Sequence, residues 1–134
     1  MEQLTPYKDR LEVTFLYLSE AHARDEWPIG NHFRTDTESP LWTPDFKQSL
    51  EVETRLERVV SLSKRFNLPS WITLAADIPH QDTMPAGPFE RIYGAWPTGF
   101  YVVDTHHTLI HVAEPKHGIF SSEPLMNAIR SALL

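Results

Sequence analysis

The distribution of apolar residues predicts four short β-strands. Segments 11–18 (LEVTFLYL), 71–76 (WITLAA), 100–104 (FYVVD) and 109–113 (LIHVA) are rich in the β-branched, aromatic and aliphatic residues that strands favour. Toward its end the first segment is apolar on both faces, as expected for a strand that is covered on both sides in a parallel sheet. The polar THHT between the last two segments predicts a hairpin, and therefore an antiparallel pair.

A long helix is predicted between the first two strands, at residues 44–66. Thr43 can serve as its N-cap, and Pro44 suits the first helical position. Apolar residues recur at helical spacing and predict a buried face, formed by Phe46, Leu50, Leu56, Val59 and Val60. The charged residues between them predict a solvated face, formed by Arg55, Glu57, Arg58 and Lys64.

Shorter helical elements complete the pattern. Residues 2–10 are typical of the tail of a helix, and residues 89–95 predict a helical turn. Ser122 is expected to cap a final helix whose apolar stripe consists of Leu125, Ile129 and Leu133. Three prolines between residues 28 and 44 predict an irregular loop. The order of elements predicts one α/β domain over residues 1–134, with a mixed sheet flanked by helices.

Composition narrows the functional classes. The chain has 134 residues, of which 41% are hydrophobic and 22% charged, as in a single globular domain. A net charge of −6 without a basic stripe disfavours nucleic acids and anionic membranes as partners. The chain shows neither an apolar run of membrane-spanning length nor a signal peptide at its start, which predicts a cytoplasmic protein. It contains no cysteine, which excludes disulfides, thiolate–zinc sites and thiol nucleophiles within these residues.

The segment YLSEAHARDEW, residues 17–27, is the first candidate site. It turns abruptly from the apolar end of a predicted strand to Glu20, His22 and Asp25. Open α/β sheets bind ligands beyond the carboxyl ends of their strands. A carboxylate close to a histidine raises the histidine pKa and fixes the orientation of its ring. The alternative is a hydrated charged loop in which His22 caps a backbone carbonyl.

Two segments resemble the iodothyronine deiodinase family, a branch of the thioredoxin-like fold. YLSEAHARDEW is similar to a signature motif of that family, and YGAWPTGFYVVD, residues 93–104, is similar to its later segment. The hairpin and the final helix also fall where the family places them. The resemblance is strong over the two motifs and loose between them. It implies a thioredoxin-like domain, a thiol- or selenol-dependent oxidoreductase, and no cofactor or resident metal.

The resemblance implies a set of site residues. Glu20 and His22 occupy the positions that lie beside the reactive cysteine or selenocysteine in the family, where they serve substrate binding and proton transfer. His22 is therefore the expected proton donor and Glu20 its orienting carboxylate. The expected substrate-binding residues are Tyr17, Asp25, Trp27, Pro97 and Lys116. The chain departs from the family at Ser19, Glu26, Thr98 and Gly99, and the last two argue against an iodothyronine substrate.

Pro97 follows an aromatic residue, Trp96, immediately before the third predicted strand. Thioredoxin-like proteins commonly carry a cis proline at that position, against the redox centre. Although only about 5% of X–Pro bonds are cis in folded proteins, the resemblance favours a cis Trp96–Pro97 bond close to His22. An ordinary trans loop proline is the alternative.

A cluster of histidines offers a second, weaker candidate site. Imidazole and carboxylate groups ligate zinc or iron, and the cluster consists of Asp104, His106, His107, His111 and His117. Strand alternation places only His107 and His111 on one face, so exposed turn residues are the favoured interpretation and a metalloprotein the third choice. The aromatic residues Trp71, Phe100 and Tyr101 are expected in the core.

The implied reaction requires a nucleophile that the chain lacks. In this fold, reduction of a carbon–halogen, peroxide or disulfide bond requires a thiolate or selenolate. The family carries that group after an earlier strand in the middle of its sheet. We therefore expect that Met1 is not the biological start, and that upstream DNA encodes this strand with a Cys-x-x-Sec or Cys-x-x-Cys motif. A gene-prediction program that reads the UGA codon of selenocysteine as a stop codon would begin the protein at a later methionine.

The expected partners are a small-molecule or thiol substrate and a thiol electron donor. Formation of a homodimer is a further alternative that the sequence does not decide. The competing hypothesis is a noncatalytic thioredoxin-like binding or interaction module that has dispensed with redox chemistry. Because the nucleophile is absent from the 134 residues, the sequence leaves open whether the chain belongs to an enzyme.

Overall fold

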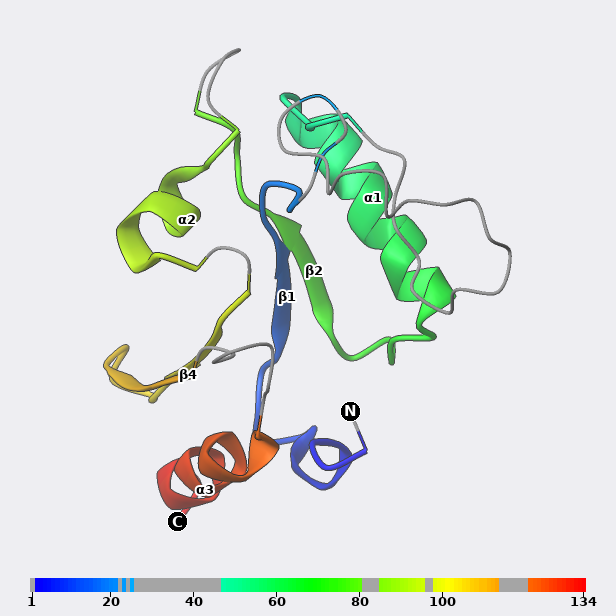
Figure 1. Ribbon diagram of the computed structural model, residues 1–134. Coiled ribbons are helices and arrows are strands. Elements are labelled where there is room, and N and C mark those ends of the chain that lie inside the picture. The colour runs from blue at the N-terminus through cyan, green and yellow to red at the C-terminus, as the bar shows by residue number, and fades with distance from the viewer. Residues whose placement is uncertain are drawn as a thin grey trace.

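The computed structural model describes residues 2–21, 23, 25, 47–80, 85–95, 98–113 and 121–134. The described part is a mixed α/β structure, as the sequence predicts (Figure 1). Its elements in chain order are η1 (Thr5–Tyr7), β1 (Thr14–Tyr17), α1 (Val52–Arg65), β2 (Thr73–Ala76), α2 (Pro88–Tyr93), β3 (Phe100–Val103), β4 (Leu109–Ala113) and α3 (Ser122–Ala132). Residues 2–10, expected as the tail of a helix, form the short 3₁₀ turn η1 and flanking turns.

The strands form two separate pairs. β1 pairs with β2 in parallel, from Thr14 opposite Thr73 to Tyr17 opposite Ala76, which confirms the parallel arrangement. β3 pairs with β4 antiparallel, which confirms the hairpin, and its register is irregular between Val102 and Val103. The sequence predicts one mixed sheet, whereas the described strands form two pairs that share no ladder.

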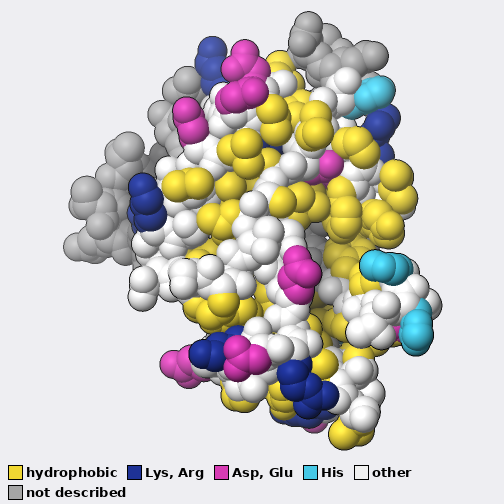
Figure 2. Space-filling view, turned by 180° about the vertical axis from the view of Figure 1, so that it is seen from behind, with side chains coloured by type: hydrophobic (Ala, Val, Ile, Leu, Met, Phe, Trp, Pro, Cys, Tyr) yellow, Lys and Arg dark blue, Asp and Glu magenta, His cyan; other side chains and the backbone are white. Residues whose placement is uncertain are grey.

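A helix packs against one face of the β1–β2 pair. Among the described helices only α1 packs against β1 and β2 (Figure 1). Thr14 and Phe15 of β1 are exposed, although the sequence predicts a strand covered on both sides. Exposed large hydrophobic side chains occur in several elements, and Figure 2 shows such side chains over much of one face of the molecule.

Helix α1 begins at Val52, later than the predicted start at Pro44. Residues 47–50 are irregular, and Glu51 takes the N-cap position in an extended conformation. The backbone N–H groups of Gln48 and Ser49 donate to carboxylates of Asp25 and Glu20, at 2.7 and 2.9 Å, and these bonds replace helical hydrogen bonds. The predicted cap Thr43, with Pro44 and Phe46, lies outside the described residues.

The predicted division of α1 into a buried apolar face and a solvated charged face is wrong in part. Val59 is fully buried as predicted, but Leu50, Leu56 and Val60 are each about two-fifths exposed. Arg55, expected on the solvated face, is fully buried. The helix therefore presents a guanidinium as well as apolar groups to the interior.

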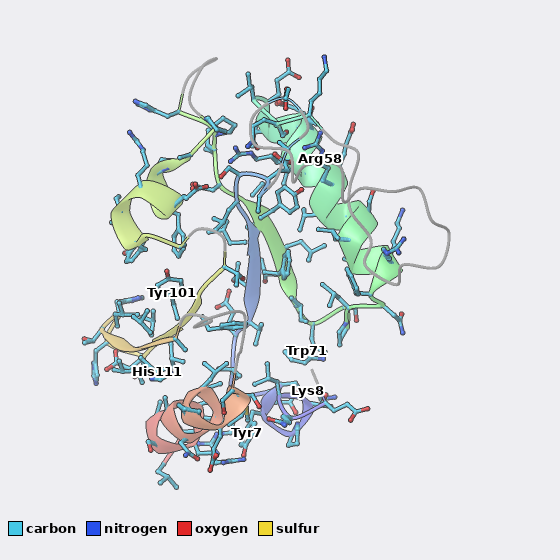
Figure 3. The ribbon with its side chains drawn as sticks, viewed as in Figure 1. Tyr7, Lys8, Arg58, Trp71, Tyr101 and His111 are labelled. Carbon is cyan, nitrogen blue, oxygen red and sulfur yellow. The ribbon has the colours of Figure 1, made fainter. Side chains whose placement is uncertain are left out.

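The main hydrophobic core lies between the β3–β4 hairpin and α3. Val102, Met126 and Ile129 are its buried members. Partly buried residues pack around them, namely Leu4, Tyr7, Leu11, Leu125, Ala128 and Leu133. Figure 3 shows Tyr7 between η1 and α3. The expected stripe of α3 is confirmed, and Met126 is an additional core residue.

Local capping defines the two later helices. Ser121, one residue before the predicted cap Ser122, accepts a hydrogen bond from the Glu123 N–H at 3.4 Å through its side chain. Gly94 ends α2 in the left-handed conformation, with φ of 60°, which glycine adopts without steric cost. The predicted helical turn at residues 89–95 is thereby confirmed as α2.

The aromatic residues expected in the core are only partly buried. Trp71, Phe100 and Tyr101 all retain some exposure. The Tyr101 ring packs edge-on against Phe89 and Tyr93, with centroids 5.4 and 5.8 Å apart. This contact joins α2 to the hairpin.

No helix in the described ranges has the length and apolar character that crossing a membrane requires.

Candidate functional site

Buried polar residues gather beyond the carboxyl ends of β1 and β2. Glu20 follows β1, and Asp77 comes directly after β2. Both are buried, as are Ser49 before α1 and Arg55 within it. Buried polar and charged groups need hydrogen-bond partners, so their contacts define how this end of the sheet is built.

Glu20 is held from three directions. Its Oε1 accepts a hydrogen bond from the Tyr17 hydroxyl at 3.1 Å and forms an ion pair with Arg58. Its Oε2 accepts from the Ser49 backbone N–H at 2.9 Å. The side-chain amide of Gln48 bonds both backbone groups of Glu20, at 2.8 and 3.1 Å. A carboxylate has about four acceptor positions, so this network fixes the carboxylate and leaves about one position open.

Tyr17, the last residue of β1, is a hydrogen-bond donor at neutral pH. Burial raises its pKa well above the ordinary value, and the nearby negative charge of Glu20 and their hydrogen bond raise it further. Arg58 acts in the opposite direction but does not reverse the shift. Arg58 reaches from α1 toward this end of β1 (Figure 3).

Arg55 joins three segments through backbone carbonyls. Its Nε and Nη2 donate to the Ser49 carbonyl at 3.2 and 3.1 Å, and its Nη1 donates to the Asp77 carbonyl at 2.7 Å. Nη2 also donates to the Pro85 carbonyl. Burial lowers the Arg55 pKa, although the charges of nearby carboxylates oppose this shift, and a guanidinium stays protonated in proteins. These contacts explain why Arg55 is buried despite its charge.

Asp77 holds the start of α2. Its Oδ1 accepts from the Phe89 N–H at 3.2 Å and its Oδ2 from the Glu90 N–H at 2.9 Å. A carboxylate at a helix N-terminus satisfies N–H groups that lack helical partners and interacts favourably with the helix dipole. The N-cap residue Gly87 has no side chain to do so, and Asp77 supplies the cap from the end of β2.

Ser19 connects the turn after β1 to α2. Its backbone N–H donates to Glu90 at 3.1 Å, and its hydroxyl lies 2.8 and 2.7 Å from the two carboxylate oxygens of Glu90. Ser19 is one of the positions at which the chain departs from the deiodinase motif, and here it has a defined partner. The polar network therefore joins β1, β2, α1 and α2.

Only part of the predicted site falls in the described residues. The structure brings Tyr17 and Glu20 into direct contact, and it places Asp25 at the surface, where its Oδ1 accepts from the Gln48 N–H at 2.7 Å. The other predicted site residues lie outside the described ranges, namely His22, Trp27, Pro97 and Lys116. The contact of Glu20 with His22 and the cis Trp96–Pro97 bond therefore stay predictions.

Sequence reasoning missed most residues of this polar network. Arg55, Arg58, Asp77 and Glu90 were expected to be ordinary surface or loop residues, or were not singled out. Asp77 offered a signal, because it directly follows a predicted strand in the same way as the YLSEAHARDEW motif does. The arginines offered none, because their spacing matches an ordinary charged helix face.

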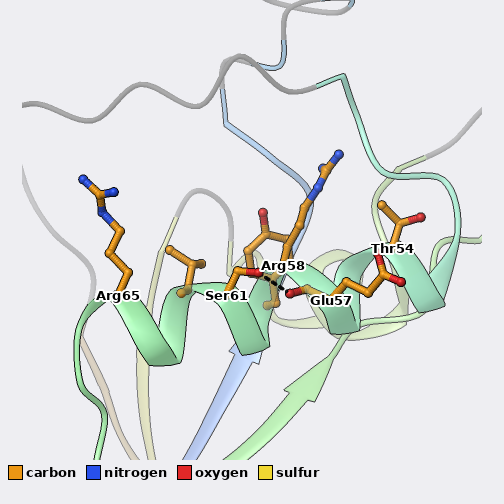
Figure 4. Close-up of a pocket in the computed structure, with 7 residues that line it drawn as sticks. Thr54, Glu57, Arg58, Ser61 and Arg65 are labelled. Atoms are coloured by element: carbon orange, nitrogen blue, oxygen red, sulfur yellow. Dashed lines mark hydrogen bonds between the residues drawn. The ribbon is translucent and has the colours of Figure 1, made fainter. Parts of the chain in front are cut away.

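A groove of about 380 Å³ runs along α1 beside the network (Figure 4). Tyr17 and Arg58, both partners of Glu20, line it together with Thr54, Glu57, Ser61, Leu62 and Arg65. The Ser61 hydroxyl donates to the Glu57 carbonyl at 2.9 Å on its rim.

The histidine cluster is dispersed in the described region. The Asp104 carboxylate accepts from the His106 and Thr108 N–H groups at 2.8 and 2.9 Å, and these bonds, chiefly that from Thr108, lower its pKa. Asp104 thus shapes the hairpin turn. The described ranges contain no group of three or more histidine and acidic side chains that could hold a metal, and His117 lies outside them.

Comparison of the chain with models of known protein families, with curated protein sequences and with solved structures gave no match.

Proposed function

We propose that this chain carries the deiodinase-like part of a thioredoxin-fold oxidoreductase that performs thiol- or selenol-dependent reduction. The observation that carries the proposal is the position of Glu20, a buried carboxylate just beyond the carboxyl end of β1 and inside the motif that resembles the deiodinase family. Tyr17 and Arg58 fix its orientation in advance. Such fixed polar groups at the ends of parallel strands are typical of α/β active sites.

The order of elements also supports a thioredoxin-like fold. A parallel pair connected through a helix is followed by an antiparallel hairpin and a final helix. The carbonyl of Val13, directly before β1, accepts from the Thr73 N–H, and the carbonyl of Tyr17 accepts from the Asp77 N–H. The backbone groups of Thr14 and Leu16 therefore face the other edge, where neither residue has a hydrogen-bond partner among the described residues. This edge is suitable for a further strand that carries the nucleophile.

The proposed chemistry divides the roles as follows. A thiolate or selenolate from outside these residues attacks the peroxide, disulfide or carbon–halogen bond of the substrate. His22 donates a proton to the leaving group, and Glu20 orients His22 through its remaining acceptor position. A thiol donor then reduces the oxidised nucleophile and becomes a disulfide. Pro97 forms a wall of the site, and the other substrate contacts come from Tyr17, Asp25, Trp27 and Lys116.

A noncatalytic thioredoxin-like interaction module is the second candidate. The observation that favours it is the number of partners of Glu20, which already accepts three hydrogen bonds and stabilises the end of the sheet without any reaction. In that case the network serves the fold alone, and no thiol chemistry depends on it.

The experiment compares the product of the whole open reading frame with the 134-residue chain, using peroxide as substrate and dithiothreitol as donor. The longer protein should show turnover, and the cysteine-free chain should not exceed a heat-killed control. His22→Ala should lower kcat about 100-fold, because general acids contribute roughly that much. Glu20→Gln should also lower kcat, while Glu53→Gln, an exposed carboxylate on α1, should leave it unchanged.

Turnover by the cysteine-free chain would refute the argument for an external nucleophile. A longer protein that reduces neither peroxides nor disulfides, nor removes halogen from a haloaromatic substrate, would favour the interaction module.

A further inference from the structure

The described helices and strands fall into two halves of the molecule. The sheet half consists of β1, β2, α1 and α2, and the hairpin half consists of η1, β3, β4 and α3. Within the described ranges, no helix or strand of one half packs against a helix or strand of the other, and the two strand pairs share no ladder. Figure 1 shows α1 and the hairpin on opposite sides of β1 and β2.

Each half has its own interior. Val102, Met126 and Ile129 form the buried core of the hairpin half, and the side chains that pack around this core come from residues 4–11 and 125–133. The sheet half instead buries Val59 together with the polar network that contains Arg55. Because the described apolar core includes no residue of the sheet half, the loss of one interior leaves the interactions of the other in place.

Helix α2 is the described connection between the halves. The Tyr101 ring of β3 packs edge-on against Phe89 and Tyr93 of α2, and its hydroxyl donates to the Tyr93 carbonyl at 3.2 Å. Tyr101 lies between the hairpin and α2 (Figure 3). Helix α2 is in turn fixed to the sheet half, because Asp77 accepts from its first N–H groups and its Glu90 accepts from the turn after β1.

This connection is weak in comparison with the folding equilibrium. An aromatic pair multiplies an equilibrium constant by only about two- to tenfold. The folding equilibrium constants of small domains are about 10³ to 10⁸. Two ring contacts therefore do not force the halves to unfold together. Parts of a protein that share few contacts commonly open as separate cooperative units.

We propose that the sheet half and the hairpin half open independently, as two cooperative units joined by α2 and Tyr101. The hairpin half then loses and regains its structure while the network around Glu20 stays intact. The candidate site therefore belongs to a unit that keeps its geometry when the rest of the described structure opens. The inference concerns the 134-residue chain alone and does not depend on the proposed function.

Native-state hydrogen exchange of the purified chain, read by mass spectrometry, tests the proposal. Met126→Ala removes a buried side chain of the hairpin half and should speed exchange in β3, β4 and α3 by about 30-fold or more. The amides of α1 and the β1–β2 ladder should change by less than about threefold. Ser131→Ala, an exposed position on α3, is the matched control and should alter neither half.

Arg55→Met provides the converse measurement. It removes the buried donors of the sheet half and should speed exchange in α1, β1 and β2 by about 100-fold, with little change in the hairpin half. Exchange that differs by less than about fivefold between the halves, in either variant, would show one cooperative unit and overturn the proposal.

The wild type decides the question if a variant does not fold. Its exchange, followed in rising urea below the unfolding transition, should give a separate urea dependence for each half. One common dependence for the protected amides of both halves would overturn the proposal.

Discussion

Arg55 is the residue whose burial has the largest predicted energetic consequence. Its guanidinium donates to the carbonyls of Ser49, Asp77 and Pro85, and the buried residues Ser49 and Asp77 would keep carbonyls without these donors if Arg55 were replaced. Arg55→Met keeps the apolar stem but removes every donor, so it should lower the free energy of unfolding by about 3 kcal/mol. Urea denaturation measures this change.

Lys64→Met is the control for Arg55, because Lys64 lies on the same helix and is exposed. It should change the free energy of unfolding by less than about 0.5 kcal/mol. An Arg55→Met variant as stable as the control would show that the buried hydrogen bonds of Arg55 do not stabilise the fold.

The raised pKa of Tyr17 predicts that the folded protein loses stability at alkaline pH. Its pKa is raised in the folded state above the ordinary value of 10.0, so the unfolded chain releases this proton at lower pH than the folded chain. The contribution of the neutral hydroxyl is therefore complete below about pH 10 and declines as the pH rises above it. Tyr17→Phe should cost about 1 kcal/mol at pH 7, through the lost bond to Glu20, and less at higher pH.

Urea denaturation of the wild type and Tyr17→Phe from pH 8 to 11 follows this difference. The two stabilities should converge above pH 10. A constant difference for Tyr17→Phe over the whole range would contradict the raised pKa.

Single residues also show how far the sequence could predict the candidate site. The resemblance selected Tyr17 and Glu20, and the structure brings these two side chains together. It did not select Arg55 or Arg58, because an arginine that binds distant carbonyls or a distant carboxylate looks like any surface arginine on an amphipathic helix. Their partners are set by tertiary contacts that no local pattern contains.

At the scale of elements, the contact of β2 with α2 depends on Gly87. A β-carbon at this position would lie 2.3–2.5 Å from the carboxylate atoms of Asp77, so a side chain there must displace that carboxylate. Gly87→Ala should therefore remove the Asp77 cap of α2 and cost about 1 to 2 kcal/mol. In an Asp77→Ala background the same substitution should cost less than about 0.5 kcal/mol, because the obstructing group is gone.

Gly94→Ala is the comparison within the same helix. Gly94 has a φ of 60° and no atom near the position of an added β-carbon, so its cost of about 1 kcal/mol comes from backbone strain alone. That cost should be the same with and without Asp77. Equal costs of Gly87→Ala in both backgrounds would show that Asp77 does not depend on the glycine.

The elements differ in how well the sequence predicts them. The four strands follow from residues that favour strands, and the final helix follows from helical spacing, which are local properties. The start of α1 does not, because Gln48 and Ser49 give their N–H groups to carboxylates of Asp25 and Glu20 from a different part of the chain. A capping signal at Thr43 and Pro44 cannot reveal such competition.

At the scale of the whole molecule, the proposal of a thioredoxin-like oxidoreductase rests on the two strand pairs and on the polar network that joins β1, β2, α1 and α2. The network orients Glu20, and the second edge of β1 is suitable for another strand. The chemistry, however, requires a nucleophile that the 134 residues do not contain. The central claim therefore concerns what accompanies this chain in its gene.

The most direct measurement is the DNA sequence upstream of the Met1 codon, read in frame. The proposed function predicts that it encodes an apolar strand followed by a Cys-x-x-Sec or Cys-x-x-Cys motif, with any UGA codon read as selenocysteine. The contradicting result is a ribosome-binding site immediately before Met1, with ordinary stop codons or unrelated sequence above it. That result would favour the noncatalytic interaction module.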